Sequence, residues 1–199
     1  MNTVPRSITP PLLNFCAEIS DQRPKYVRSK PSSDAQPSAC FDNVTRKIER
    51  ANGKAVHGWA IWHIPELYFE AEHHGVWSNR EGKLLDVSPQ INGVGEILFL
   101  PDPKATYEET SFRQNIVRPA NFSANSIEFS NLSNEYHTIF NKYRTGRASA
   151  QLLNWPLPDH PRKHRLADEA HFRQDNIVPL PELTTRFSKM ISRQKSCAK

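Results

Sequence analysis

The chain has 199 residues, of which only 37% are hydrophobic, so its composition predicts one domain with a core smaller than the whole chain. No run approaches the roughly 18 apolar residues that a membrane-spanning helix needs, and the N-terminal residues do not form a secretory signal pattern. The formal net charge of +5 is spread along the sequence, which permits contact with a nucleic acid but indicates it only weakly.

The first segment to show regular periodicity follows a stretch rich in proline, serine and charge. We expect that stretch, residues 1–37, to be a flexible tail. Apolar residues then recur at helical spacing, with Ser38 as the expected N-cap and Asn52-Gly53 as the expected left-handed end. The residues that carry this spacing are Phe41, Val44 and Ile48.

The helix is followed by four segments with strand-like composition, separated by turn residues. We expect them to form an antiparallel meander, which together with the helix gives an α+β fold over residues 38–104. The predicted strands cover residues 56–64, 67–77, 84–87 and 96–100. Residues 105–192 are expected to form a helical and loop-rich extension packed on this core, and residues 193–199 a frayed tail.

The chain has three cysteines, and one of them opens the predicted helix. Cys16, Cys40 and Cys197 are widely spaced and form no CxxC motif, which favours free thiols in a reducing, cytoplasmic compartment. Cys40 falls in the first helical turn, where the helix dipole and free backbone amides stabilise a thiolate and can donate to an oxyanion. The alternative is that Cys40 is a small buried apolar residue.

Two adjacent histidines lie in the second predicted strand. Strand alternation sends them to opposite faces, with His73 on the more apolar face and His74 on the more polar one. This pattern places His73 toward the core and His74 toward a wetter surface or cleft. Glu70 and Glu72 share the polar face and are expected to be solvated. An alternative is a metal site formed by the two histidines with Cys40, although the side chains of neighbouring strand residues point to opposite faces.

Asp86 lies between apolar residues in the next predicted strand. A carboxylate there is costly to bury without a partner, and an imidazole on the adjacent strand is the natural candidate. The short hairpin between the two strands makes this pairing geometrically reasonable. The alternative is that Asp86 caps the turn that begins at Ser88-Pro89.

The order of a helix cysteine, a strand histidine and an aspartate on the following strand resembles the papain-like superfamily. The similarity is to its transglutaminase-like and bacterial cell-wall peptidase branches, and to a set of uncharacterised bacterial and phage domains. It lies in three short motifs, at residues 39–44, 70–77 and 82–89. In the second motif the histidine of the pattern falls on His74, while His73 occupies an aromatic position.

The resemblance implies a thiol-dependent hydrolase, such as a thiol protease, or an acyl transferase that acts on an amide, isopeptide or ester bond without a cofactor. Cys40 would be the nucleophile, His74 the general base and acid, with His73 as the alternative base, and Asp86 the residue that orients the imidazole. The Cys40 amide would donate to the oxyanion. The further candidates are Asn43 and His57 as oxyanion or support residues, and Trp59, Trp62 and Trp77 as cleft or core residues.

A protein or peptide is the substrate that this interpretation favours, and no membrane partner is expected. The rival hypothesis is a binding module on the same fold, which would contact a protein or a nucleic acid through its basic loops. The sequence does not distinguish hydrolysis from acyl transfer, because water and amines compete for the same thioester.

Overall fold

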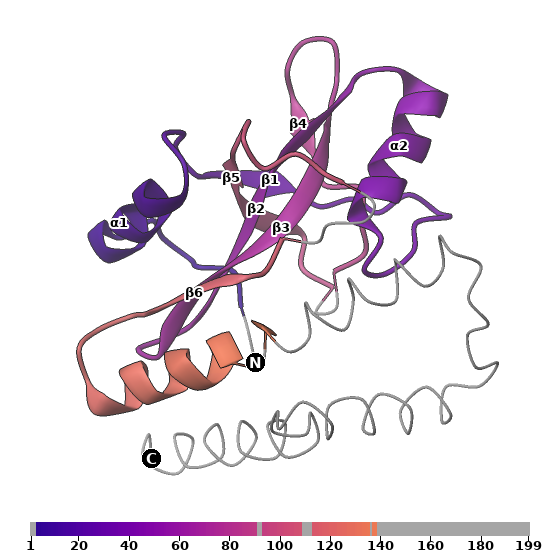
Figure 1. The fold of residues 1–199 in the computed structure, drawn as a ribbon. Coiled ribbons are helices and arrows are strands. Elements are labelled where there is room, and N and C mark those ends of the chain that lie inside the picture. The colour runs from indigo at the N-terminus through magenta and orange to yellow at the C-terminus, as the bar shows by residue number, and fades with distance from the viewer. Residues whose placement is uncertain (1–2, 91–92, 109–112, 136, 139–199) are drawn as a thin grey trace, which may run out of the picture.

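A computed structural model describes residues 3–90, 93–108, 113–135 and 137–138 of the chain. The fold is α+β, with a mostly antiparallel sheet and three helices in this part of the chain (Figure 1). The third helix covers residues 124–135 and follows the last strand. The other elements are α1 Pro10–Ile19, β1 Lys25–Arg28, α2 Cys40–Ala51, β2 Lys54–Ile64, β3 Tyr68–Ser78, β4 Leu84–Leu85, β5 Glu96–Pro101 and β6 Ile116–Pro119.

The strands form one sheet in the order β1-β5-β2-β3-β4, with β6 paired to β3. The predicted meander is therefore wrong in one connection, because β5 crosses over to pair with β2 instead of following β4. All four central residues of β5 are completely buried, which requires neighbours on both sides of the strand. They are Ile97, Leu98, Phe99 and Leu100.

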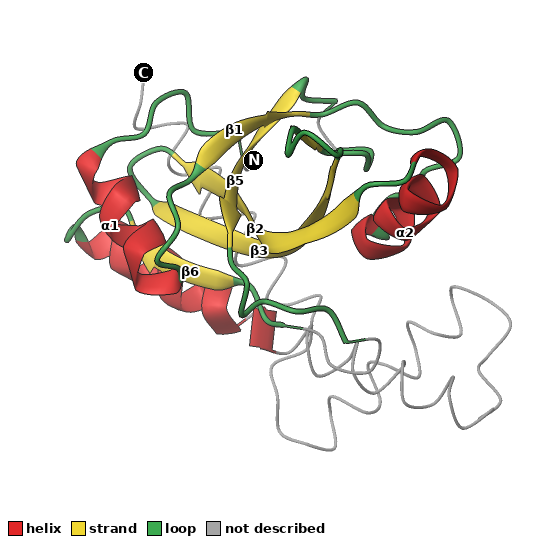
Figure 2. Ribbon diagram, turned by 90° about the horizontal axis from the view of Figure 1, so that it is seen from above, coloured by secondary structure: helices red, strands yellow, loops and turns green. Residues whose placement is uncertain are grey.

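The two ends of the sheet meet, so the sheet closes into a small barrel (Figure 2). Ser29 and Asp86 pair in a parallel bridge just after β1 and β4. The Asp86 amide donates to the Arg28 carbonyl at 3.0 Å, and the Lys30 amide donates to the Asp86 carbonyl at 2.8 Å. Closure places Asp86 inside the seam between the first and last strands.

The expectation of a flexible tail over residues 1–37 is wrong for the described part of that segment. α1 packs on the outer face of the sheet through Leu12, Phe15 and Cys16, which are buried with Trp59 and Leu98. Prolines at the start of α1 suit the first helical turn, where an amide hydrogen has no partner within the helix. β1 then pairs antiparallel with β5 and completes the barrel.

The inner face holds a second apolar cluster, made by Val27, Ala60, Trp62, Val76, Ile97 and Phe99. The third helix covers one end of the sheet, where the ring of Phe129 stacks on that of Tyr68 with centroids 5.3 Å apart. The extension predicted for residues 105–192 is described only to residue 138, where it contributes β6 and this helix. The spacing of apolar residues also predicts helices around 136–143 and 183–191. These two helices and the tail 193–199 lie outside the described residues, apart from positions 137–138.

Within the described residues, no helix combines the length and the apolar character needed to cross a bilayer. The four predicted strands of the core each coincide with an observed one to within about two residues at either end.

Candidate active site

Cys40 is the first residue of α2, and its side chain is partly exposed. The N-cap is Ala39, not the expected Ser38, and no side chain caps the helix. Ser38 instead has a left-handed backbone, with φ at 59°. An alanine side chain cannot accept a hydrogen bond, so no side chain caps the backbone amides of the first helical turn, where the Cys40 thiol lies.

His74 and Asp86 form a buried pair at the inner face of the barrel. His74 Nε2 lies 3.1 Å from Asp86 Oδ1, and the two residues are 5% and 0% exposed. An ionised carboxylate only accepts hydrogen bonds, so Nε2 carries the hydrogen and donates it. Nδ1 is then the ring nitrogen left for another partner.

Cys40 is close enough to the His74 ring for its charge and a side-chain hydrogen bond to act on the pKa of His74. Burial on its own would lower the pKa of His74. The charge and hydrogen bond of Cys40, together with those of Asp86, instead raise the pKa of His74 well above its ordinary value. The structure therefore brings Cys40, His74 and Asp86 into one chain of contacts in which the imidazolium is the favoured form.

Asp86 accepts a full set of hydrogen bonds. Oδ1 receives His74 Nε2 and the Ser88 amide, each at 3.1 Å, while Oδ2 receives Ser29 Oγ at 2.8 Å and Gln90 Nε2 at 2.7 Å. Burial on its own would raise the pKa of Asp86, but the hydrogen bond and charge of His74, with the bonds from Ser29 and Gln90, lower it. The carboxylate is thus ionised and held in one orientation.

Sequence reasoning missed Ser29 and Gln90, which fix this carboxylate. The available signal was the cost of burying Asp86, which required partners beyond a single imidazole. The bond between Ser29 and Asp86 joins residues 57 positions apart, and only the closure of the barrel brings them together.

α2 reaches the histidine through a gap in the edge of β3. β4 pairs with Trp77–Ser78 and β6 pairs with Tyr68–Ala71, so the described strands leave residues 72–76 of this edge uncovered. α2 packs against β3 there. A β-carbon added to Gly75 would lie 2.9 Å from the ring of Phe41, so only glycine lets the helix approach this closely.

His73 lies on the opposite face of β3 and takes part in different contacts. Its Nε2 lies 2.8 Å from the Ala105 carbonyl oxygen, and its ring packs on Phe41 and Trp59 at centroid distances of 4.8 and 5.4 Å. Burial and neighbouring charges outweigh the Ala105 hydrogen bond and lower the pKa of His73. Of the two candidate bases, the structure places only His74 beside Asp86.

Both faces of β3 are largely covered, so the predicted contrast between an apolar and a wetter face holds only at Glu72, which is exposed. His73 is half-buried, whereas His74, Glu70 and Tyr68 on the face predicted to be wetter are buried. Glu70 was expected in solvent, but its Oε1 accepts Asn115 Nδ2 at 2.7 Å and lies 2.9 Å from His137 Nε2. Alternation sorts residues onto two faces, but closure of the barrel decides which face is covered.

The two candidate oxyanion donors are placed differently. The side chain of Asn43 is buried and bonded to both backbone groups of Gln36 at 2.9 and 2.8 Å, and to Ser88 Oγ at 3.1 Å. It ties α2 to the loop that carries Asp86, so it supports the site and is not a free donor. His57 projects from β2 on the face of His73 and meets Phe41 edge-on at 5.7 Å, away from the face of His74.

Of the tryptophans offered as cleft or core, two belong to the core. Trp59 and Trp62 are buried, and their Nε1 atoms donate to Asp102 at 3.0 Å and to Glu72 at 2.9 Å. Trp77 is half-buried and donates to the Asn52 carbonyl at the other end of α2. The described residues also contain no group of three or more His, Cys, Asp and Glu side chains placed to hold a metal ion.

No family model matches the chain, and neither a curated protein nor a solved structure is detectably similar to it.

Proposed function

We propose that the protein is a thiol-dependent hydrolase or acyl transferase that acts on an amide, isopeptide or ester bond, in a cytoplasmic setting and on a papain-like core. Cys40 is the nucleophile, His74 the general base and acid, and Asp86 the residue that orients the imidazole. The observation that carries the proposal is that His74 interacts both with Asp86, through Nε2 at 3.1 Å, and with the Cys40 side chain.

In the first half-reaction His74 takes the proton of the Cys40 thiol as general base, so that the sulfur reacts as a thiolate. The thiolate attacks the carbonyl carbon of the substrate, a carbon–sulfur bond forms, and the carbonyl electron pair moves to oxygen. When that pair returns, the bond to the leaving amine or alcohol breaks and His74 supplies the proton that the leaving group needs. The product of this half-reaction is a thioester on Cys40.

The second half-reaction reverses these roles. His74, now neutral, removes a proton from water or from an acceptor amine, which attacks the thioester carbon. The carbon–sulfur bond then breaks, the thiolate leaves and the imidazolium is restored. Asp86 keeps its charge throughout and stabilises the imidazolium through Nε2.

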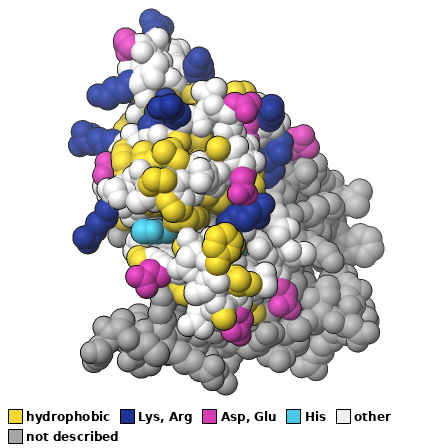
Figure 3. Space-filling model, turned by 90° about the vertical axis from the view of Figure 1, so that its left-hand side faces the viewer, with side chains coloured by type: hydrophobic (Ala, Val, Ile, Leu, Met, Phe, Trp, Pro, Cys, Tyr) yellow, Lys and Arg dark blue, Asp and Glu magenta, His cyan; other side chains and the backbone are white. Residues whose placement is uncertain are grey.

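The oxyanion is stabilised by the start of α2. The helix has no side-chain cap, so the Cys40 amide has no competing side-chain acceptor when negative charge develops beside it. A protein or peptide is the substrate class that fits a partly exposed thiol at the end of a helix. The rival binding module gains little from the face in Figure 3, where Lys and Arg side chains are dispersed around an apolar centre with Asp and Glu between them.

The test is alkylation of Cys40 by iodoacetamide at pH 6, followed by mass mapping of the labelled peptide. Cys16 is an internal reference for an inert thiol, because burial raises its pKa to about 12. We expect Cys40 to react much faster than Cys16, and His74→Gln to slow that reaction by about tenfold or more, since the imidazolium is lost. His73→Gln is the matched control, because glutamine can still donate to the Ala105 carbonyl.

A second measurement follows acetyl transfer from p-nitrophenyl acetate, with Cys40→Ser as the blank. We expect an acetyl group on Cys40 that the wild-type protein hydrolyses and that His74→Gln releases more slowly. The proposal fails if Cys40 labels as slowly as a buried thiol, or if the two histidine variants behave alike while both remain folded by circular dichroism.

A further inference from the structure

An exposed carboxylate lies next to the proposed base on the same strand. Glu72 precedes His74 by two residues of β3, so both side chains project from the same face. We propose that Glu72 is a specificity-determining residue that binds an ammonium group of the substrate, such as a lysine side chain on the acyl part of the bond that is cleaved. The inference rests on the proposed function, because it assigns Glu72 to the substrate that Cys40 attacks.

Glu72 lies at the opening through which α2 reaches the histidine. The described strands leave residues 72–76 of this β3 edge uncovered, and Glu72 is the first of them. Of the β3 residues on this face, all within the described part of the chain, Glu72 alone is exposed, while Glu70 and His74 on either side of it are buried. A substrate that reaches His74 from solvent therefore passes this carboxylate.

A neutral donor orients the Glu72 carboxylate without cancelling its charge. Trp62 Nε1 donates to Glu72 Oε2 at 2.9 Å, and the Trp62 side chain is buried. An indole is a donor with no charge, so the carboxylate stays negative. No cation of the described residues forms an ion pair with Glu72, which leaves Oε1 to accept a charge-assisted hydrogen bond from a ligand.

The other two carboxylates beside His74 are already bonded within the protein. Glu70 Oε1 accepts from Asn115 and lies 2.9 Å from His137 Nε2. Asp86 accepts hydrogen bonds on both of its oxygens and is fully buried. Glu72 is therefore the carboxylate on this side of the strand that can meet a substrate cation.

The spacing of Glu72 and His74 fits the length of a lysine side chain. Two residues of a strand rise by about 7 Å. A lysine ammonium stands at the end of a flexible four-carbon stem. A substrate with its carbonyl carbon beside Cys40 and His74 can therefore lay that stem along β3 and bring its ammonium to Glu72.

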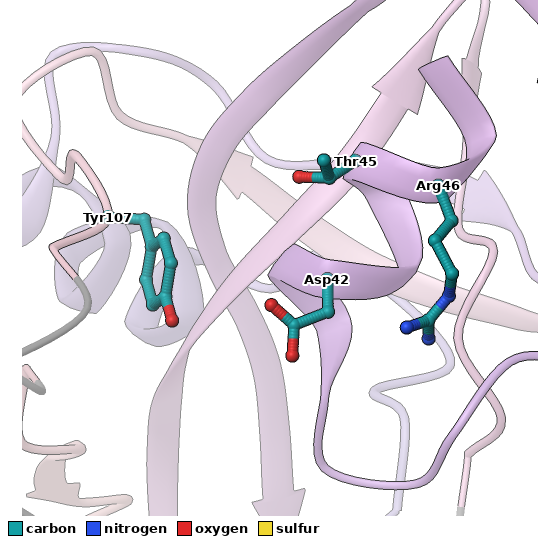
Figure 4. Close-up of a pocket in the computed structure, with 4 residues that line it drawn as sticks. All are labelled: Asp42, Thr45, Arg46 and Tyr107. Atoms are coloured by element: carbon teal, nitrogen blue, oxygen red, sulfur yellow. The ribbon is translucent and has the colours of Figure 1, made fainter. Parts of the chain in front are cut away.

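A second exposed carboxylate lies near the thiol in sequence but on another side of α2. Asp42 follows Cys40 by two residues, which is a rotation of about 200° around the helix. Figure 4 shows its carboxylate facing a pocket whose described lining is Asp42, Thr45, Arg46 and Tyr107. Cys40 is not among these lining residues, so Asp42 provides a matched control: a negative charge close to the thiol in sequence but off the face of β3.

The experiment compares the p-nitrophenyl esters of N-acetyl-lysine and N-acetyl-norleucine, whose acyl chains differ only by the terminal ammonium. In both reactions the Cys40 sulfur bonds to the acyl carbon, the ester carbon–oxygen bond breaks and p-nitrophenolate leaves with the electron pair. We expect Glu72→Gln to lower the lysine-to-norleucine ratio of kcat/KM about fivefold at low salt, as for one exposed ion pair. Glutamine keeps an oxygen that can accept from Trp62.

Asp42→Asn removes the same charge and should leave the ratio unchanged. The role of Glu72 is overturned if Glu72→Gln changes the ratio no more than Asp42→Asn does. It is also overturned, without any variant, if added salt does not lower the wild-type ratio. Turnover of the norleucine ester by the wild type, with Cys40→Ser as the blank, tests the proposed function separately. No turnover at Cys40 overturns both proposals, whereas turnover with an unaltered ratio overturns only the role of Glu72.

Discussion

Replacing Asp86 by asparagine tests whether the buried carboxylate acts on the chemistry or only on the fold. Asparagine has nearly the same shape, so Oδ1 can still accept from His74 and from the Ser88 amide. The amide group would replace Oδ2, where Ser29 Oγ can turn to accept and Gln90 can flip its own amide. The main change is therefore the loss of negative charge beside the imidazolium.

The size of the effect follows from the hydrogen bond between His74 and residue 86, which would no longer involve a negative charge. A hydrogen bond to a charged group contributes about 1.5 kcal/mol more than a neutral one, which corresponds to about tenfold in the population of the imidazolium–thiolate pair. We expect the pKa of His74 to fall and iodoacetamide labelling of Cys40 at pH 6 to slow by about that factor. Asp102→Asn is the control, because Asp102 is also buried and accepts from Trp59 and the Lys104 amide away from Cys40.

Stability against pH gives a second readout with a defined sign. The pKa of Asp86 is lowered in the folded protein, so its contribution is present above the unfolded value of about 3.9 and is lost as the pH falls through the folded value. Asp86→Asn should therefore cost about 2 to 3 kcal/mol near neutral pH and progressively less below about pH 4. Wild-type labelling of Cys40 in a variant that shows this stability loss would refute the catalytic role of the carboxylate.

Two further substitutions test how the site is held together. Gly75→Ala places a β-carbon 2.9 Å from the Phe41 ring, so it should destabilise the fold by about 1 to 3 kcal/mol and slow Cys40 labelling, measured by urea unfolding and mass mapping. Asn43→Leu removes the bonds from α2 to Gln36 and to Ser88, and should cost about 2 to 3 kcal/mol with a parallel loss of labelling. Unchanged labelling in both destabilised variants would show that the approach of α2 does not limit reactivity.

The elements of the core could be predicted because local pattern determines them. α2 begins at Cys40 and ends at Ala51, and the C-cap residue Asn52 has a positive φ of 56°, which an asparagine tolerates better than most residues. The order of the strands could not be obtained in the same way, since sequence distance favours a meander and does not predict that β5 crosses over to pair with β2. The continuous apolar run of β5 was the available sign that it lies in the centre of the sheet.

The candidate site was accessible from the sequence only in part. The residue types and their order in the chain pointed to Cys40, His74 and Asp86, and the structure places these three in contact. Their environment was not accessible, because the seam at Ser29 depends on pairing between strands distant in sequence. The sequence indicated α1 only as an alternative, since Leu12, Leu13 and Phe15 suggest either a short helix or a docking segment within the predicted tail.

The interruption in the edge of β3 explains why the thiol and the imidazole meet. A strand edge normally pairs with another strand, but among the described strands β4 and β6 cover only the two ends of this one. The start of α2 occupies the interval and contacts both faces, with Phe41 over Gly75 on the outer face and Cys40 bonded to His74 on the inner face. A continuous strand at this edge would satisfy the backbone of β3 and separate the cysteine from the histidine. The gap is therefore the feature of the fold on which the proposed chemistry depends.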